Sequence, residues 1–531
     1  MKLNYVIFLL GSFLIIFASN FFITSDDKEV SKNIDSKTIS SQFSETEEYT
    51  ISDETIFSEP AMDKSKIIKF ANNNFNGEIS LLGGKLVNVQ LKKYFKNPES
   101  DEKVQLLDRS EYLSKLILKA KNVELPNDLL FDNILINNDK EVLLSAKFGN
   151  FEIRRRYLFD SDSFSINHQV IVINKSGQNF IFRLFEESNG EINAESYHNF
   201  DYQFNEDLEK IDYLPSESER VIEDINWYGF SKKYFLAANI LDYSGEKTLK
   251  YQKKTAGILR TVLSYKTINL LPGNQFTMDS KIFLGPKDVK ILSLYGPNLE
   301  QAHDLGWFKW LAAPLEKVLN LSNKFIKNYG IAIIIITILI RVLFLPLTIK
   351  SMMSMKKMQA KMALMKPKLD EIKEKFKDDK ATQNSEIMKL YSKEGMNPLS
   401  SLSGCLPMLI QLPVFVALYN VLLYSLDLRH TSFLWINDLS APENLFDIVG
   451  IPFRILPLVM GISWFLTQKM TPPNPGQDEF QTKIFQYMPI LFTVMFWGLP
   501  SGLILYWTVS NIISIFQQLY INNKFKKMQG A

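Results

Sequence analysis

Residues 331–350, IAIIIITILIRVLFLPLTIK, form the stretch that most restricts how this chain can fold. A helix needs about 20 predominantly apolar residues to cross the hydrocarbon core of a bilayer, and this run supplies them. Arg341 lies near the middle of the run, and Lys350 ends it. A guanidinium at that depth costs about 2.5–3.5 kcal/mol or more on insertion scales. The sequence therefore predicts a membrane-spanning helix whose charge faces the protein interior or water.

Other apolar runs predict five further spans. Residues 5–23 favour an uncleaved anchor over a cleaved signal peptide, because the run is long and no small-x-small site follows. Residues 406–425 and 451–467 are two more candidates. Residues 484–521 are too long for one span, and the sequence WGLPSG at 497–502 divides them into a hairpin of two.

The predicted spans offer Arg341 no acidic partner, since their cores lack aspartate and glutamate. A permanent intramembrane ion pair is therefore not expected. The available polar side chains are uncharged: Thr337 one helical turn away, Gln411, Asn420, Tyr506, Ser510 and Asn511. A cation that is solvated by dipoles and water suits a transient anionic ligand. The alternative is that these polar groups simply hold helices together.

Residues 61–300 have the pattern of an antiparallel β-sandwich. Runs such as FEIRRRYLFD and FSINHQVIVIN alternate in polarity, and turn sequences such as Asn189-Gly190 separate them. His168 and His198 could act on a sugar together with a carboxylate. No spacing singles out such a site, so structural roles are favoured for both histidines.

Two segments flank this region. Residues 26–60 are rich in Ser, Thr, Asp and Glu, and a segment of this composition is expected to be a flexible linker. Residues 306–330 favour an amphipathic helix in the membrane interface over a surface helix of the β domain. The apolar residues that can share one face of this helix are Trp307, Leu311, Leu315, Val318, Leu319 and Phe325.

Residues 350–398 predict a helical hairpin whose polar turn is KDDKATQNS. A methionine stripe marks its first helix: Met352, Met355, Met358, Met362 and Met365. The stripe could form the hairpin's own core or meet varied apolar partners. The segment carries twelve lysines against seven acids, so the positive-inside rule places it in the cytoplasm. The basic C-terminal tail lies on the same side, as does the N-terminus if there are six spans.

Composition and motifs exclude several other functions. The balance of 60 basic and 58 acidic residues gives no general argument for nucleic-acid binding. The single cysteine, Cys405, cannot form an intrachain disulfide. No glycine-rich phosphate loop is visible, and no cofactor or metal is expected.

Three runs resemble the YidC membrane-protein insertases: IRVLFLPLTIKSMMSMKKMQ, SGCLPMLIQLPVFVALYNVL and MPILFTVMFWGLPSGLILYWTVSNIISIFQQ. The resemblance implies five core spans around a hydrophilic groove that opens to the cytoplasm and to lipid. The groove arginine, threonine and glutamine of the family match Arg341, Thr337 and Gln411, and its paired aromatics match Tyr506 and Trp507. Trp507 stands where tyrosine is common in relatives, so the role of that hydroxyl does not carry over. Ser510 and Asn511 complete the predicted groove.

The resulting expectation is an α + β membrane protein with six transmembrane helices and a periplasmic β-supersandwich, a fold of the kind related to sugar-binding sandwiches. The expected parts are an anchor (1–25), a linker (26–60), a β domain (61–300), an interfacial helix (301–330) and a five-span core (331–531). Both termini would be cytoplasmic, and residues 26–305 would lie in the periplasm of a two-membrane bacterium.

The expected function is insertion and folding of nascent inner-membrane proteins, alone or with the Sec translocon, and without enzymatic catalysis. The bilayer is a further expected partner, and the ribosome is a candidate partner. A small-anion transporter and an envelope enzyme that acts on sugars through the β domain are the alternatives.

Overall fold

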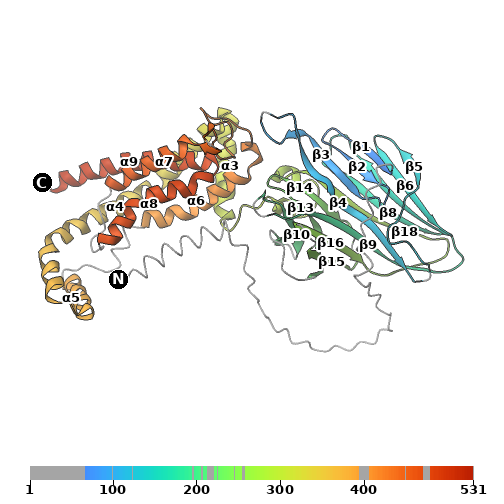
Figure 1. Cartoon of the computed structure of the whole chain (residues 1–531), viewed down its shortest axis with the longest axis horizontal. Coiled ribbons are helices and arrows are strands. Elements are labelled where there is room, and N and C mark those ends of the chain that lie inside the picture. Colours follow the sequence, from blue (N-terminus) through green and yellow to red (C-terminus); the bar gives the residue numbers. More distant parts are fainter. Residues whose placement is uncertain are drawn as a thin grey trace. The chain divides into compact units, whose positions relative to one another are not determined.

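The computed structural model describes residues 66–393 and 406–529, apart from 99, 122, 194–195, 205–206, 212–219, 224, 244, 254–256, 449 and 471–478. The predicted anchor (1–25) and linker (26–60) lie outside the described residues. The chain divides into two compact units, Met1–His303 and Asp304–Ala531. The first unit is rich in strands and the second in helices (Figure 1).

Two nine-stranded antiparallel sheets build the β-rich unit. The first sheet has the order β1-β2-β3-β4-β9-β16-β15-β12, with β17 paired to β9. Its strands are β1 (Ile67–Ala71), β2 (Phe75–Ser80), β3 (Leu86–Phe95), β4 (Lys103–Ala120), β9 (Phe180–Glu191), β12 (Arg220–Glu223), β15 (Lys247–Lys253), β16 (Ile258–Tyr265) and β17 (Ile268–Leu270).

The second sheet has the order β11-β10-β13-β14-β18-β8-β7-β6-β5. Its strands are β5 (Asn133–Asn137), β6 (Glu141–Phe148), β7 (Phe151–Phe159), β8 (Ser165–Asn174), β10 (Asn199–Phe204), β11 (Asp207–Ile211), β13 (Ile225–Ser231), β14 (Phe235–Leu241) and β18 (Gln275–Pro286). Alternation along the strands sets which side chains are buried, as β7 shows. Ile153, Arg155 and Tyr157 are buried, whereas Arg154 and Arg156 between them are partly exposed. The prediction of a β-rich domain is confirmed.

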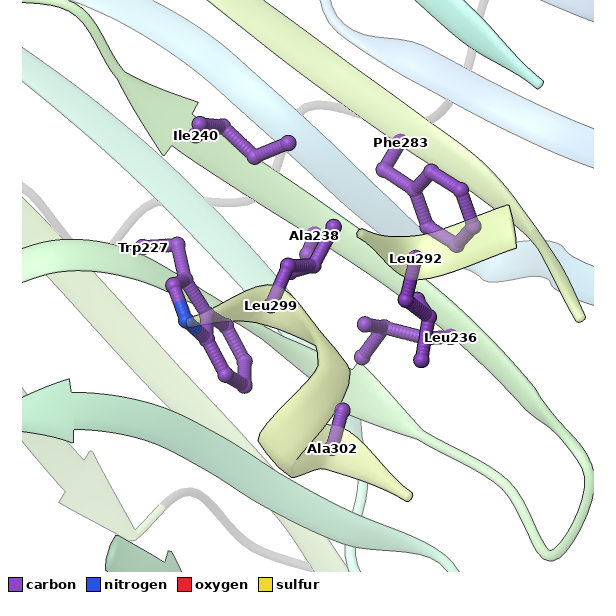
Figure 2. Packing of buried hydrophobic residues seen from close by; sticks show 8 residues of the cluster. All are labelled: Trp227, Leu236, Ala238, Ile240, Phe283, Leu292, Leu299 and Ala302. Carbon is purple, nitrogen blue, oxygen red and sulfur yellow. The ribbon is translucent and has the colours of Figure 1, made fainter. Parts of the chain in front are cut away.

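Two short helical segments cover part of the second sheet. They are α2 (Val289–Leu292) and η4 (Leu299–Ala302), and Asp288 caps α2 by accepting hydrogen bonds from the backbone of Lys290 and Ile291. Figure 2 shows their apolar side chains packed against those of β13, β14 and β18. The cluster consists of Trp227, Leu236, Ala238, Ile240, Phe283, Leu292, Leu299 and Ala302. The burial of this cluster holds α2 and η4, at the C-terminal end of the β-rich unit, against the second sheet.

Seven helices form the described part of the second unit. They are α3 (Lys309–Ile326), α4 (Tyr329–Lys375), α5 (Lys380–Lys393), α6 (Leu406–Tyr424), α7 (Ile455–Met470), α8 (Glu479–Met495) and α9 (Ser501–Gln529). Shorter elements join them: η6 (Leu426–Leu428), β19 (Phe446–Ile448), β20 (Ile451–Phe453) and η7 (Phe496–Gly498). Helix α9 packs against α4, α6 and α7, and α3 packs against α4 and α6.

Helix α4 runs without a break through residue 350, from the predicted span at 331–349 into the predicted helical hairpin at 350–398. Pro346 and Pro367 lie inside it, so each removes one backbone hydrogen bond without ending the helix. The residues between the two prolines are mostly Met, Lys, Gln and Ala, which are good helix formers. Helix α5 begins inside the predicted polar turn, where Asp379 accepts hydrogen bonds from the backbone of Ala381 and Thr382.

The predicted spans correspond only partly to the observed helices. Residues 451–453 belong to β20, which pairs with β19, so the predicted span at 451–467 begins as a helix only at Ile455. The chain between α8 and α9 breaks at 496–500, inside the long apolar run. Among the described helices, α4 alone is long and apolar enough to cross a membrane by itself, whereas α7 and the Gln411–Tyr424 part of α6 are shorter apolar helices.

Helix α3 is amphipathic, but its predicted apolar face is not buried as a whole. Ala312 and Leu319 are buried, whereas Phe325 is 78% exposed. Trp307 precedes the helix and is 97% exposed. The helix contacts α4 and α6, and the placement of its exposed apolar residues in the membrane interface stays a prediction.

Candidate functional site

Arg341 lies in the apolar part of α4, and its partner is a single hydroxyl group. Its Nε and Nη2 both donate to Oγ of Ser510 in α9, with an Nε–Oγ distance of 2.8 Å. Within the described residues no carboxylate pairs with the guanidinium, and Nη1 has no hydrogen-bond partner. Arg341 therefore has no fixed counter-ion among the described residues, and its Nη1 remains available as a donor.

A second polar contact lies one helical turn away on α9. Gln411 of α6 donates its amide hydrogen to the hydroxyl of Tyr506, and Tyr506 precedes Ser510 by four residues. Residues four apart lie on the same face of a helix. One face of α9 thus carries the polar partners of both α4 and α6. The arrangement brings together four of the predicted site residues.

The structure places three other predicted residues elsewhere. The hydroxyl of Thr337 is buried and donates to the carbonyl of Ile333 in its own helix, at 2.6 Å. Asn511 of α9 donates to Oγ of Ser463 in α7 at 3.1 Å. Asn420 donates to the carbonyl of Leu305 at 2.9 Å. Asn420 therefore holds the chain before α3, and its hydrogen bond among the described residues goes to Leu305 and not to Arg341.

Trp507 belongs to an aromatic cluster. Its ring lies 4.8 Å from that of Phe415, 5.2 Å from that of Phe496 and 5.5 Å from that of Trp464, measured between centroids. These rings come from α6, η7 and α7, so Trp507 packs the helices around α9. The structure gives this residue a packing role rather than a polar one.

The methionine stripe divides between core and surface. Met355 and Met365 are buried, whereas Met352, Met358 and Met362 are partly exposed. Gln383 of α5 is buried and donates to the carbonyl of Lys373 at 2.8 Å, which ties α5 back onto α4. Some methionines therefore form the core, while the others, together with the exposed Leu364, leave apolar surface uncovered.

Sequence comparisons identify both units. The family described as "60Kd inner membrane protein" matches residues 321–528, and the family described as "YidC periplasmic domain" matches residues 67–318. The "Membrane protein insertase YidC" of Pelobacter propionicus is 37% identical over 462 residues, which cover 83% of each chain. The chain belongs to the YidC family.

Other members give similar matches. The YidC of Geotalea uraniireducens is 35% identical over 84% of this chain and 85% of its own length. A solved structure of an active YidC insertase aligns over 87% of this chain and 95% of that chain, with 18% identity and a TM-score of 0.35. Within the family, the strand-rich unit of this YidC corresponds to the periplasmic domain.

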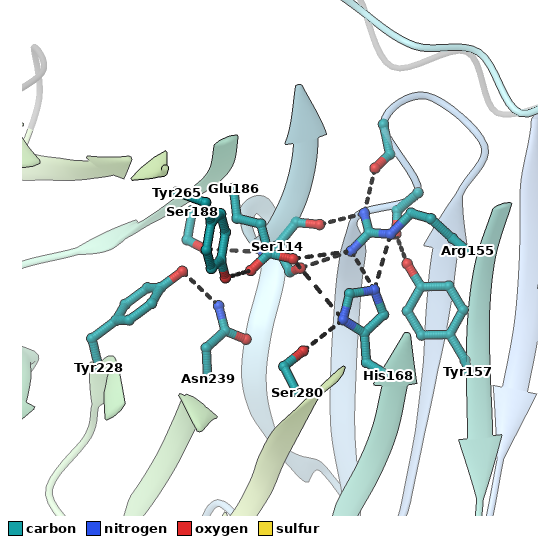
Figure 3. Close-up of polar contacts among 12 residues, drawn as sticks. Ser114, Arg155, Tyr157, His168, Glu186, Ser188, Tyr228, Asn239, Tyr265 and Ser280 are labelled. Atoms are coloured by element: carbon teal, nitrogen blue, oxygen red, sulfur yellow. Dashed lines mark hydrogen bonds and ion pairs between the residues drawn. The ribbon is translucent and has the colours of Figure 1, made fainter. Parts of the chain in front are cut away.

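The periplasmic domain of this YidC contains a buried polar network that crosses between its two sheets (Figure 3). Arg155 of β7 donates through Nη2 to Oγ of Ser114 in β4 at 2.7 Å, and through Nη1 to the carbonyl of Ser114 at 2.6 Å. The hydroxyl of Ser114 donates to Glu186 of β9 at 2.9 Å, and Glu186 lies 3.8 Å from Arg155. Burial raises the pKa of the Glu186 carboxyl.

His168 is part of the same network. Its Nε2 accepts a hydrogen bond from Nε of Arg155 at 3.1 Å, so Nδ1 carries the proton and donates to Ser280 at 2.8 Å. Burial and the Arg155 charge hold the pKa of His168 well below its ordinary value of 6.5. His198 is partly exposed instead and lies 3.2 Å from Glu191. The two histidines therefore have different partners among the described residues.

A polar hollow of about 600 Å³ lies elsewhere in the periplasmic domain and contains no histidine. Its lining includes Lys69, Asn76, Glu78, Asn88, Gln105 and Asp139. The hypothesis that His168 or His198 acts in a sugar-processing pocket therefore gains no support from this hollow.

The buried His168 predicts a pH-dependent stability of the periplasmic domain. Below about pH 6.5 the unfolded chain binds a proton at this residue and the folded domain does not, so the free energy of unfolding falls as pH falls. One such proton contributes a slope of at most about 1.4 kcal/mol per pH unit. His168→Gln should remove this contribution, as measured by urea pulse proteolysis of the whole protein between pH 7.5 and 5.5. If the free energy of unfolding changes equally with pH in the wild type and in His168→Gln, His168 is not the source of the pH dependence. The raised pKa of Glu186 has the opposite effect on the pH dependence, and it is present in both proteins.

Sequence reasoning missed several residues that organise this YidC. Ser463 is the buried partner of Asn511, and Glu443 accepts a hydrogen bond from the backbone of Leu456 at the start of α7, at 2.7 Å. Arg155 was also missed, although its alternation with Ile153 and Tyr157 indicates an inward side chain. For Ser463 and Glu443 no comparable local pattern exists.

Proposed function

We propose that this chain inserts newly made proteins into the bacterial inner membrane through a hydrated groove around Arg341. The observation that carries the proposal is the coordination of Arg341, which has one hydroxyl partner and no carboxylate among the described residues. A polar, often acidic, translocated segment would meet this cation on its way across. Family membership and the names of the curated relatives support the same activity.

The physical effect of the groove is a lower barrier. Polar groups of the client exchange water for Arg341, Gln411, Tyr506 and Ser510, and they cross only the remaining apolar layer. The client's apolar segment leaves sideways into lipid. Apolar burial and the membrane potential supply the free energy, and the potential is worth about 2.3 kcal/mol per charge per 100 mV.

The proposed topology has six spans, namely the N-terminal segment (1–25) and five in the core (331–531). The positive charge of the 350–398 segment places that segment and both termini in the cytoplasm. Residues 26–305 then lie in the periplasm, in agreement with the match to the YidC periplasmic domain. Helix α3 lies in the membrane interface, as its exposed aromatic residues and lysines favour.

The proposed partners are nascent membrane proteins and the lipid bilayer, with the Sec translocon as a shared route for some clients. The basic C-terminal tail is the candidate ribosome contact. Insertion uses no cofactor, because desolvation is the barrier and no covalent bond changes.

Reconstitution tests the function directly. Purified protein in vesicles that contain no other translocase should integrate a newly synthesised single-span client, measured by protection of its translocated segment from protease. Empty vesicles and vesicles with an unrelated multi-span protein are the controls. Anion uptake without client integration would instead favour the transporter alternative.

The cytoplasmic hairpin should recruit clients. Removing residues 355–395 should lower cross-linking of nascent chains to the groove several-fold, because the hairpin leaves Leu364 and Met388 exposed. The double variant Leu364→Gln/Met388→Gln should also lower cross-linking of nascent chains to the groove, and it should leave the charge and the fold unchanged. Asn384→Gln, on an exposed polar position of α5, is the matched control. Unchanged cross-linking in the deletion would reject this role.

A further inference from the structure

The loop between α6 and α7 contains a tight turn with an unusual tip. Phe433 and Ile436 exchange two backbone hydrogen bonds of 2.9 Å, so Leu434 and Trp435 form the two-residue tip. Leu434 has φ +53°, a left-handed conformation that favours Gly or Asn and is strained for a bulky side chain. The Leu434 side chain is nevertheless 74% exposed, so burial against the described residues does not offset that strain.

The indole of Trp435 is held in one orientation. Its Nε1 donates to Oε1 of Glu443 at 2.6 Å, and the other carboxylate oxygen of Glu443 accepts from the backbone of Leu456 at 2.7 Å. Glu443 is 4% exposed, so the anchor point is inside the protein. Trp435 is 43% exposed. Its polar edge is therefore satisfied internally, while part of its apolar surface faces outward.

The turn lies at the beginning of the apolar helix α4. The ring of Phe433 packs against the backbone of Gly330, where a Cβ would lie 2.1 Å from the ring carbon Cγ. Gly330 is the second residue of α4 and immediately precedes the apolar run from Ile331. This contact places the Leu434–Trp435 tip at the level where the membrane-spanning part of α4 starts.

We propose that the turn Phe433–Ile436 is a membrane-interface anchor that inserts Leu434 and the apolar face of Trp435 into lipid. All four residues are uncharged, and an indole at the end of a span suits the boundary between headgroups and acyl chains. Insertion gives the exposed leucine an apolar environment that the described residues do not provide. The inference rests on α4 crossing the membrane, and it does not require that the chain inserts clients.

The proposed anchor also fixes the depth, relative to the bilayer, of the loop that precedes α7. Glu443 connects the indole of Trp435 to the first turn of α7. Lipid that holds the indole therefore holds the end of α7 at the bilayer surface.

Spin labels measure the depth of the tip in the full chain. The native Cys405 is replaced by Ser, single cysteines are introduced at Leu434, Ser432 and Asn437, and each protein is placed in nanodiscs of phosphatidylethanolamine and phosphatidylglycerol, one copy per disc. Collision rates with oxygen, which prefers lipid, are compared with those of a water-soluble nickel chelate. Leu271→Cys in a turn of the β-rich unit is the aqueous control, and Leu343→Cys on the exposed apolar face of α4 is the deep control.

The expected result is an oxygen-to-nickel ratio several-fold higher at 434 than at 271, lower than at 343, and higher than at the flanking positions 432 and 437. A ratio at 434 equal to that at 271 would place the tip in water and overturn the proposal. Low collision rates with both reagents would show that protein covers the tip, and would overturn it as well.

A second measurement leaves the turn unaltered, in case Leu434→Cys does not assemble. Phospholipids with a photoreactive group near the headgroup should label the peptide that contains residues 433–436 in the unmodified protein. Absence of that adduct, with labelling of the start of α4 as the positive control, would also overturn the proposal.

Discussion

Arg341→Ala is expected to lower insertion of clients with acidic translocated segments on the order of tenfold or more. A close charge pair in a partly hydrated protein environment is worth up to about 4 kcal/mol, and each 1.4 kcal/mol is a factor of ten. Arg341→Lys should preserve most activity, because the structure shows no carboxylate that needs the two-pronged guanidinium. Arg341→Glu should be worse than Arg341→Ala, since it repels the same segments.

The measurement is insertion of matched acidic and neutral clients into vesicles that contain equal amounts of each variant. Neutral clients should be affected less, because Gln411, Tyr506 and Ser510 would still bind water. Ser510→Ala is the control for the local contact, and its effect should be small because it leaves the charge in place. If Arg341→Lys is as defective as Arg341→Ala, or if both client types decline equally, the arginine acts through hydrogen bonding or packing instead of charge.

Arg155→Met should destabilise the periplasmic domain by about 3–5 kcal/mol, the range for removing one partner of a buried ion pair. The substitution removes the guanidinium hydrogen bonds to the carbonyls of Gly83 and Ser114, and it removes the cation beside Glu186. Urea pulse proteolysis of the full-length protein in nanodiscs, read on the fragment of the β-rich unit, measures the change. The double variant Arg155→Met/Glu186→Gln should recover part of the loss, because no uncompensated charge then remains inside.

Arg156→Met is the matched control for this experiment. Arg156 is the next residue of β7, its side chain is 38% exposed, and it pairs with Glu141. Exposed pairs are worth about 0–1 kcal/mol, so this variant should remain close to the wild type. If Arg155→Met were as mild as Arg156→Met, the buried network would not determine how the two sheets hold together.

The β-rich domain could be predicted from alternation, because strands bury every second residue. The same rule places Arg155 inward, between Ile153 and Tyr157. Its partners could not be predicted, since Ser114 and Glu186 are 41 and 31 residues distant in sequence and reach it only when the two sheets face each other. The sequence of one strand is enough to predict that Arg155 is buried. Its hydrogen-bond and ion-pair partners come from other strands, so they depend on how the two sheets pack together.

In the candidate site too, some features could be predicted from the sequence and others could not. The absence of acids in the apolar runs is readable directly and matches the contacts of Arg341. Which of the polar candidates contacts Arg341 is not readable, because Ser510 is 169 positions away. Asn420 was an equal candidate on composition, yet it contacts Leu305, because α3 packs against α6. The way the helices pack decides which polar side chain contacts Arg341, and local sequence patterns do not predict that packing.

The full length of α4 is a further feature that the apolar run alone does not indicate. The change from apolar to basic residues at residue 350 indicates a change of surroundings, from membrane to water, and not a change of secondary structure. Lysine, methionine and glutamine extend a helix as well as leucine does, so α4 passes from one solvent to the other without ending.

Because α4 is continuous, motion at one end of this helix can be transmitted to the other end. About 34 residues separate Arg341 from the end of the helix, a rod of about 50 Å at 1.5 Å per residue. A tilt of about 10° around the level of Arg341 would displace the far end by about 9 Å, provided that the rod stays straight. A force applied to the hairpin would therefore exert torque on the segment that carries Arg341. Pro346 and Pro367 are the two points where the rod bends most easily, so they set how much of that torque reaches the bilayer.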